Sequence, residues 1–380
     1  MIVILYPQFH RIGGIARYLD AFLSNLPAGS PPVVLVTGDP PAAEWSRPGV
    51  RCIAIPVPGN RLGLALWGWK AAREVARLAR EAPVTAVNLH MPPLIPGLFL
   101  PPGLRLVLTA HTTYLGMSGR FEGNAHFRSP WNALAVRLKM LMERAVIARA
   151  DTVVTLTEQG RDELARYGRT EGVEVVPNGV DLAEFTDDAA VARDIDVIFC
   201  GRIELRKGSR PMVEVCRRLV QADPAIRIAI VGYGDDEAHV WKALAPLGDN
   251  VLLTGKVSFG DMVSYYRRSR LYASTSYYEG LPGTCLEAMA MRLPPVVWDR
   301  AFYRHLVVHG ISGRIVRVND VEAMAGEILR LLRRDEERQA LGDNARAIVR
   351  DRYDWRRLAA RLVQIDERAA RVRAVQEATT

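Results

Sequence analysis

The sequence predicts an α/β protein built from two doubly wound parallel sheets. Its 380 residues are too many for one typical domain and fit two. Short apolar runs, of the kind found in strands buried on both faces, alternate with helical patterns of about 10–15 residues. This alternation occurs in both halves of the chain, as expected for two sheets covered by helices.

The elements of the first half follow from its apolar runs and helical periodicity. The expected strands are Ile2–Tyr6, Val33–Thr37, Ala86–Leu89, Leu106–Thr109 and Thr152–Leu156. The expected helices are Ala16–Asn25, Leu64–Arg80 and Trp131–Arg149.

The second half repeats the pattern. The expected strands are Val197–Cys200, Arg227–Val231, Val251–Thr254, Leu271–Ser274 and Pro295–Val297. The expected helices are Arg210–Gln221, Asp236–Ala245, Gly260–Arg268, Thr284–Met291 and Val321–Leu332.

A turn signal, Val176-Pro-Asn-Gly-Val-Asp181, separates the halves. We expect one domain over residues 1–178 and a second over 179–357, with a C-terminal helix at about 358–380 packing back on the first. Ligands of open α/β sheets bind beyond the carboxyl ends of the strands. The active site is therefore expected in the cleft between the two domains.

Composition indicates a cytoplasmic protein. The stretch Met1–Tyr6 is too short for a signal peptide, and no run of about 18 apolar residues occurs. The four cysteines have no metal-ligand spacing and are expected to be reduced core thiols. The net charge is +8, yet residues 1–150 contain 16 of the 50 basic and only 7 of the 42 acidic side chains. This excess favours an anionic partner for the first domain, although an arginine-rich composition would explain it equally well.

The first candidate site motif follows the strand Val197–Cys200. It reads Gly201-Arg202-Ile-Glu-Leu-Arg-Lys207-Gly208, which puts Arg202 and Lys207 in a loop at the carboxyl edge of the sheet. A guanidinium and a flexible ammonium make a good diphosphate clamp. The alternative is an ordinary solvated basic loop.

The second motif follows the strand Leu271–Ser274. After Glu279 comes a tight turn, Pro282-Gly283, and Thr284 is expected to begin a helix whose N–H groups can bind a phosphate. Glu287 projects from the first turn of that helix. Its spacing from Thr284 also fits a capping box, which would give it a purely structural role.

These motifs resemble those of the retaining GT4 glycosyltransferases, which have the GT-B fold. Glu279 and Glu287 match the family's E-x7-E motif, and Gly201-Arg202 with Lys207-Gly208 resembles its diphosphate loop. Pro177–Asp181 resembles the family's linker, and Gly13-Gly14 its N-terminal glycine loop. The matches come in the family's order and span residues 1 to about 360.

The resemblance implies a role for each matching residue. Arg202 and Lys207 would bind the donor diphosphate, with backbone N–H groups of Gly283 and Thr284. Glu287 would hold the ribose, and Glu279 would contact the donor sugar. Further contacts to the donor would come from the glycines Gly13 and Gly14, from His111 in the sugar pocket, and from the backbone at Val257 beside the base.

Two segments depart from the family pattern. Met291-Arg292-Leu293-Pro294 replaces a small-residue turn, and Arg300–His305 replaces a glycine-rich pattern. Both changes lie near the nucleotide-facing edge, so they bear on the specificity for base and donor more than on the fold. No metal site is expected, because Asp194-Ile-Asp196 precedes its strand, and no cofactor is expected besides the donor.

The predicted function is transfer of a hexosyl unit from a GDP- or UDP-sugar to a hydroxyl of a lipid-linked or oligosaccharide acceptor, with retention of configuration. The stretch Arg61–Arg73 mixes tryptophans with basic residues and indicates peripheral binding to an anionic membrane, at the inner face of the cytoplasmic membrane. No nucleic-acid motif accompanies it. The alternatives are a sugar-nucleotide epimerase or phosphorylase on the same architecture and a non-catalytic sugar-nucleotide-binding subunit.

Overall fold

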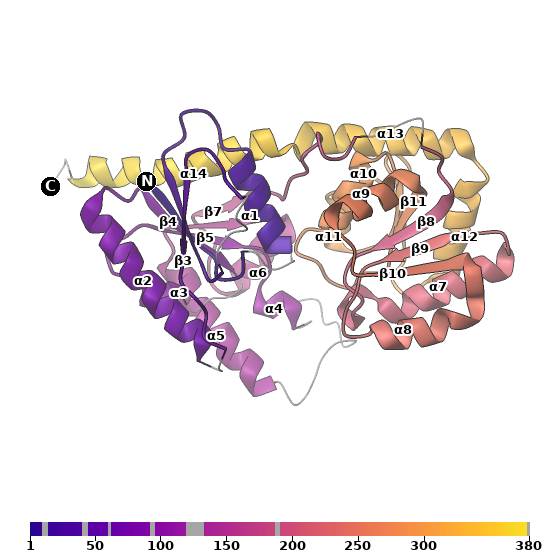
Figure 1. Ribbon diagram of the computed structural model, residues 1–380, viewed down its shortest axis with the longest axis horizontal. Coiled ribbons are helices and arrows are strands. Elements are labelled where there is room, and N and C mark those ends of the chain that lie inside the picture. Colours follow the sequence, from indigo (N-terminus) through magenta and orange to yellow (C-terminus); the bar gives the residue numbers. More distant parts are fainter. Residues whose placement is uncertain are drawn as a thin grey trace. The chain divides into compact units, whose positions relative to one another are not determined.

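The computed structural model describes residues 1–9, 14–39, 45–59, 62–91, 96–118, 133–186 and 191–377. The chain divides into two compact units. Unit 1 contains the described residues up to Gly179 together with those from Trp355 onward, and unit 2 contains those from Val180 to Asp354 (Figure 1).

Unit 1 is built on a parallel sheet with the strand order β3-β2-β1-β4-β5-β6-β7. Its strands are β1 (Ile2–Leu5), β2 (Val33–Thr37), β3 (Val50–Ala54), β4 (Ala86–Met91), β5 (Leu106–Ala110), β6 (Thr152–Thr155) and β7 (Val173–Val175). Its helices are α1 (Gly14–Ser24), α2 (Gly63–Glu81), α3 (Pro96–Phe99), α4 (Tyr114–Met117), α5 (Ala133–Arg149), α6 (Glu158–Arg166) and α14 (Trp355–Glu377).

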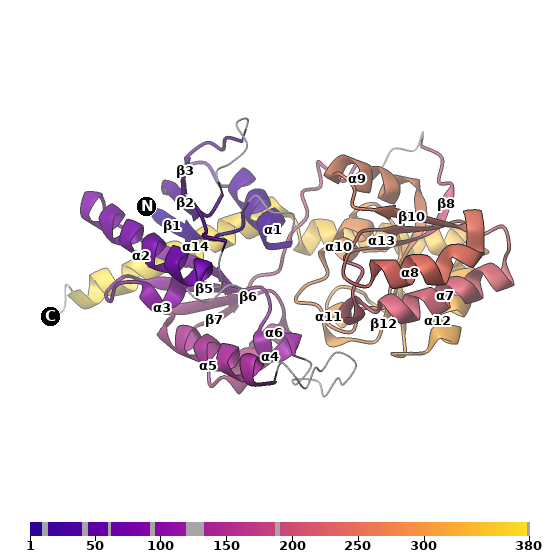
Figure 2. The ribbon, with the colours of Figure 1, turned by 60° about the horizontal axis from the view of Figure 1, so that its bottom comes forward.

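Helices cover both faces of this sheet (Figure 2). On one face, Trp67 of α2 and Val146 of α5 pack against alternate strand residues such as Val87 and Leu108. On the other face lies α14, which contacts α1 and β4. Trp355 begins α14 and is buried, with its ring 4.9 Å from that of Tyr18.

Unit 2 is built on a second parallel sheet with the order β10-β9-β8-β11-β12-β13. Its strands are β8 (Ile195–Cys200), β9 (Ile228–Val231), β10 (Val251–Gly255), β11 (Ser269–Ser274), β12 (Pro295–Trp298) and β13 (Arg314–Val316). Its helical segments are η2 (Leu205–Lys207), α7 (Ser209–Ala222), α8 (Glu237–Leu244), η3 (Ala245–Asn250), α9 (Phe259–Arg268), α10 (Gly283–Ala290), α11 (Ala301–Arg304), α12 (Val321–Leu332) and α13 (Asp335–Arg352).

Alternation along each strand divides the core of unit 2 into two hydrophobic clusters. Ile198 and Tyr272 face α9, α10 and α13, whereas Val197 and Leu271 face α7, α8 and α12. The predicted α/β class with two doubly wound parallel sheets is confirmed.

The strand orders reverse direction between β1 and β4 in the first sheet and between β8 and β11 in the second. Neighbouring strands at such a switch point send their connections to opposite faces, which opens a crevice beyond their carboxyl ends. The loops after β8 and β11 contain the two motifs singled out from the sequence.

Three edge strands, β3, β7 and β13, were not expected. Each is the outermost strand at one edge of its sheet, and β3 and β7 are only partly buried. They therefore lack the continuous apolar run by which the central strands were recognised.

Candidate functional site

The loops at the carboxyl edge of the second sheet pack against one another through close backbone contacts at glycines. Gly208 has a φ of 71°, and a Cβ there would lie 1.9 Å from the carbonyl oxygen of Thr275. The Thr275 hydroxyl in turn donates to the Gly208 carbonyl at 2.8 Å. A Cβ at Gly232 would lie 1.8 Å from the carbonyl oxygen of Gly201. Because only glycine permits these approaches, the loops after β8, β9 and β11 form one packed unit.

This packing places the side chain of Lys207 in contact with that of Glu279. The Lys207 ammonium forms an ion pair with Glu279 Oε1, which also accepts a hydrogen bond from the Ser276 hydroxyl at 2.9 Å. Glu279 is buried, with 8% of its surface exposed. The predicted phosphate ligand and the predicted sugar ligand therefore touch each other, and a donor that binds here meets both a cation and a carboxylate.

Arg202 lines the same pocket as Lys207, and its side chain is open to solvent. The Arg202 side chain is 55% exposed, and its Nε lies 3.6 Å from Glu204 Oε2. Arg206, which the sequence did not single out, ties the two loops by donating to the Tyr278 carbonyl at 3.0 Å and pairing with Glu204. Arg202 is thus available to an incoming anion, whereas Arg206 serves the loop structure.

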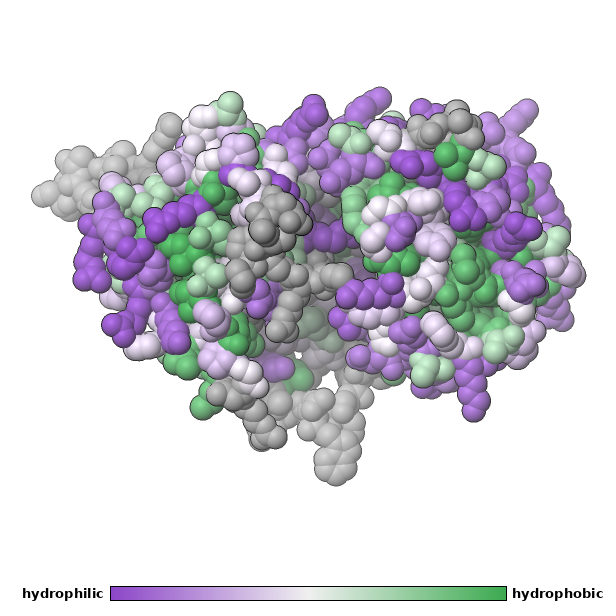
Figure 3. Space-filling model, viewed as in Figure 1, coloured by the Kyte–Doolittle hydropathy of each residue, from purple (hydrophilic) through white to green (hydrophobic). Residues whose placement is uncertain are grey.

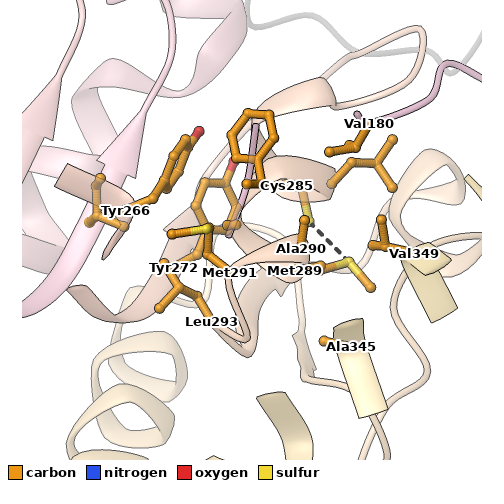
Figure 4. Packing of buried hydrophobic residues seen from close by; sticks show 14 of the residues in the cluster. Val180, Tyr266, Tyr272, Cys285, Met289, Ala290, Met291, Leu293, Ala345 and Val349 are labelled. Atoms are coloured by element: carbon orange, nitrogen blue, oxygen red, sulfur yellow. Dashed lines mark hydrogen bonds between the residues drawn. The ribbon is translucent and has the colours of Figure 1, made fainter. Parts of the chain in front are cut away.

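The N-terminus of α10 lies in the loop that follows β11. The helix begins at Gly283, its N-cap is Pro282, and no side chain caps it. The first N–H groups of a helix have no partner within it, so those of Gly283 and Thr284 can receive an anion. The buried face of α10 packs among Tyr266, Tyr272 and α13 in the core, which fixes the position of this end (Figure 4).

The capping-box alternative for Glu287 is wrong. A capping box needs Thr284 at the N-cap, but Thr284 lies inside the helix and its hydroxyl is 3.0 Å from the hydroxyl of Tyr272. Glu287 is buried, and its Oε2 accepts a hydrogen bond from Tyr266 Oη at 3.1 Å. It is therefore held by α9 and does not cap its own helix.

Val257, expected near the nucleobase, follows β10 and is half-buried against the cluster that contains α10. The preceding Gly255 has a φ of 64° and accepts a backbone hydrogen bond from Gly232 at 3.1 Å. Val257 thus follows a turn that is bonded to the loop after β9.

Unit 1 provides a second group of predicted residues. His111 directly follows β5, is 8% exposed, and lies 2.9 Å from His90 of β4, measured between His111 Nε2 and His90 Nδ1. Gly14 begins α1, and a Cβ there would meet no described atom within 4 Å. Gly13 lies outside the described residues.

Burial keeps both histidines neutral at neutral pH. Desolvation lowers the pKa of His111 to about 3. Desolvation, together with the nearby His111, lowers the pKa of His90 well below its usual value. His90 was missed from the sequence because its only signal was a position at a strand end, and the pairing of β4 with β5 was not predictable.

The Asp194-Ile-Asp196 pair contacts arginines. Asp194 binds the Arg268 guanidinium through two hydrogen bonds of 2.8 and 2.6 Å, and Asp196 lies 3.1 Å from Arg270. Across the described residues, no group of three or more histidine, cysteine or acidic side chains could hold a metal ion. No disulfide joins the four cysteines, all of which lie in the described ranges: Cys216 and Cys285 are buried, and Cys52 and Cys200 are partly buried.

Comparison with known proteins gives the class and then the family. The model for Glycosyl transferases group 1 matches residues 184–348, and that for Glycosyltransferase Family 4 matches residues 12–184. Sucrose-phosphate synthase from Thermosynechococcus elongatus has the same fold, with a TM-score of 0.79 and 20% identity over 96% of this chain and 97% of its own. The fold is therefore of the GT-B class. The chain belongs to the GT4-type glycosyltransferase family that these two models describe.

Two curated relatives name activities of their own. A phosphatidyl-myo-inositol mannosyltransferase of Mycolicibacterium smegmatis is 31% identical over 50% of this chain and 51% of its own length. A GDP-mannose:cellobiosyl-diphosphopolyprenol alpha-mannosyltransferase of Xanthomonas campestris is 27% identical over 61% of this chain and 63% of its own. The matched part of the chain thus spans about half to three-fifths of these relatives.

Proposed function

We propose that the chain transfers a hexosyl unit from a GDP- or UDP-linked sugar to an acceptor hydroxyl, with retention of configuration. The observation that carries this proposal is the contact of Lys207 with Glu279 beside Arg202 and the free N-terminus of α10. Cations and backbone N–H groups suit a diphosphate, and buried carboxylates suit sugar hydroxyls. Family membership supports the same reaction and is the basis for retention.

Catalysis in this proposal comes from positioning and from stabilisation of the leaving group. As the bond between the sugar and the diphosphate breaks, negative charge develops on the departing diphosphate. Arg202, Lys207 and the N–H groups of Gly283 and Thr284 would stabilise that charge. These groups supply positive charge of the kind that a metal ion supplies in other transferases, so we propose a metal-independent reaction.

The two glutamates would act as hydroxyl ligands. Glu287 would hold the ribose, and Glu279 would hold the donor sugar while its Oε1 stays bonded to Ser276. Neither is assigned as a nucleophile or a proton donor.

A panel of GDP- and UDP-sugars tests the proposal. Binding and release of nucleoside diphosphate are measured with and without a lipid extract. We expect one donor to bind and its diphosphate to be released faster when acceptor is present. Isomerisation of the donor without acceptor would identify an epimerase, and binding without turnover would identify a non-catalytic subunit.

We also propose that the acceptor is lipid-linked and that unit 1 binds an anionic membrane. The names of both curated relatives include a lipid acceptor. In unit 1, a cavity of about 590 Å³ is lined by Arg137, Arg144 and Arg166 beside apolar side chains that include Leu141. None of the three arginines forms an ion pair with a described residue, and Leu141 is 64% exposed. Guanidinium groups around an apolar wall suit a phosphate headgroup that carries a lipid chain.

The segment first expected to bind the membrane is less suited to that role. Trp67 on α2 is fully buried and packs in the core, while Trp69 is 43% exposed with the Arg73 guanidinium 4.8 Å from its ring. The surface over α2 mixes hydrophobic with hydrophilic side chains (Figure 3). Within the described ranges, no helix is long and apolar enough to cross a membrane.

Replacing Arg137 and Arg144 with alanine is expected to weaken binding to phosphatidylglycerol vesicles by about tenfold or more, because each basic side chain near such a surface contributes about 1 kcal/mol. Flotation at low salt measures the binding. Arg217→Ala in unit 2, which removes an exposed arginine of α7, is the matched control. Equal flotation of the double variant and the wild type would refute the proposed surface.

A further inference from the structure

The ring of His111 contacts the ring of His90, a residue of the neighbouring strand. β4 and β5 are parallel neighbours, with His90 opposite Thr109, so His90 reaches the residue that follows β5. The two rings lie 5.2 Å apart between centroids, and the His111 backbone N–H donates to the Met91 carbonyl at 3.2 Å. The approach of His90 Nδ1 to His111 Nε2, 2.9 Å, is a hydrogen-bond distance.

Two neutral imidazoles share this hydrogen bond, so one nitrogen carries the proton and the other accepts it. The other nitrogen of His90, Nε2, is buried and has no partner among the described residues. A buried N–H without an acceptor is rarer in proteins than a buried acceptor that lacks a donor. The proton of His90 therefore belongs on Nδ1, where it has a partner, and Nε2 is left as the unfilled acceptor.

The tautomer of His111 follows from that of His90. If His90 donates, His111 Nε2 is the acceptor, and the single proton of neutral His111 lies on Nδ1. His111 Nδ1 makes no hydrogen bond to a described residue. Tyr18 packs on the His111 ring in an edge arrangement, with 4.6 Å between centroids and 89° between planes, which opposes a flip of the ring.

We propose that His90 is a positioning residue that fixes His111 as the Nδ1–H tautomer, so that His111 offers the donor substrate a hydrogen-bond donor and not a proton acceptor. This inference rests on the proposed function for its substrate, a nucleotide-linked sugar. The N–H would bind a sugar hydroxyl or a phosphate oxygen. His111 then stabilises and orients the donor and does not remove the proton of the acceptor hydroxyl.

Nitrogen NMR of ¹⁵N-histidine-labelled protein tests the tautomer without substrate. The chain has 7 histidines, and His111→Gln identifies the His111 signals by their loss. We expect the two-bond correlations of His111 to show a protonated Nδ1 and a bare Nε2, unchanged between about pH 5.5 and 8. Protonation on Nε2, or an imidazolium in this pH range, would overturn the proposal.

Two variants of His90 test its positioning role. His90→Leu removes the hydrogen bond, so His111 is expected to show both tautomers and kcat to fall by about ten- to a hundredfold. His90→Asn puts an amide nitrogen where Nδ1 lies, and it should restore the single tautomer and most of kcat. If His90→Leu does not fold, the spectra of the wild type and of His90→Asn still show which tautomer His111 adopts.

The outcomes separate this inference from the proposed function. A His90→Leu protein that keeps the single tautomer, or that loses it with unchanged kcat, refutes the positioning role. A wild type with the expected tautomer that turns over no sugar nucleotide counts against the proposed function alone.

Discussion

Lys207→Ala is expected to lower turnover by about 10²–10³-fold, the size of effect found when one donor to a developing anion is removed. The Lys207 ammonium is paired with the buried carboxylate of Glu279, which fixes its position in the loop after β8. Loss of the cation removes charge from the side of the departing diphosphate without altering the sheet that supports the loop. Release of nucleoside diphosphate measures the rate, and circular dichroism verifies that the variant is folded.

The same substitution at Lys242, an exposed lysine on α8, is the matched control and should leave turnover unchanged. Lys207→Arg keeps the charge and should retain more activity than Lys207→Ala. Near-normal turnover of Lys207→Ala would contradict the proposed role of this residue.

The central strands could be predicted because each is buried on both faces and reads as an unbroken apolar run. β2, for example, is Val-Val-Leu-Val-Thr with every residue buried. β13 is only three residues long and two of them are partly exposed, so it gives no such run. Edge strands of this kind are defined by their pairing partner, which local sequence does not reveal.

Prediction of the site from local sequence was limited in the same way. The spacing of Glu279 from Glu287, and the order of the motifs along the chain, were visible in the sequence. The ion pair of Lys207 with Glu279 was not, because it depends on a close approach of Gly208 to Thr275, 67 residues apart. Likewise, the spacing of Thr284 and Glu287 fitted a capping box equally well, and only the helix start at Gly283 excludes it. Local patterns predict which residues can act, and long-range backbone contacts determine which of them meet.

Asp366 gives the fold of unit 1 a dependence on pH. It lies on α14 with no exposed surface, and its Oδ1 accepts from the Asn88 amide at 3.3 Å. Its Oδ2 is buried and has no hydrogen-bond partner among the described residues. Desolvation raises the pKa of Asp366 from 3.8 to about 7, against the opposing effects of the Asn88 hydrogen bond and of Arg105.

A raised pKa means that the folded protein binds this proton more tightly than the unfolded chain does. The stability that the proton provides is fully present below about pH 4 and is lost as the pH rises through 7. A difference of about three pKa units corresponds to about 4 kcal/mol. Asp366→Asn has the same shape, keeps an oxygen for Asn88 and carries no charge at any pH. It should therefore be more stable than the wild type at pH 8 by up to about 4 kcal/mol, and the difference should shrink towards pH 5.

Thermal unfolding at pH 5, 6, 7 and 8 measures this difference, with a shift in Tm of about 2–4 °C for each kcal/mol in a unit of this size. Asp162→Asn, the same substitution at an exposed site on α6, is the control. Its Tm should equal that of the wild type at each pH. Some pH dependence should remain in Asp366→Asn, because burial also raises the pKa of Glu143 to about 7. A Tm difference between Asp366→Asn and the wild type that is the same at pH 5 and pH 8 would show that Asp366 is ionised in the folded protein throughout. In that case the Asp366 carboxylate would be charged while buried between α14 and β4.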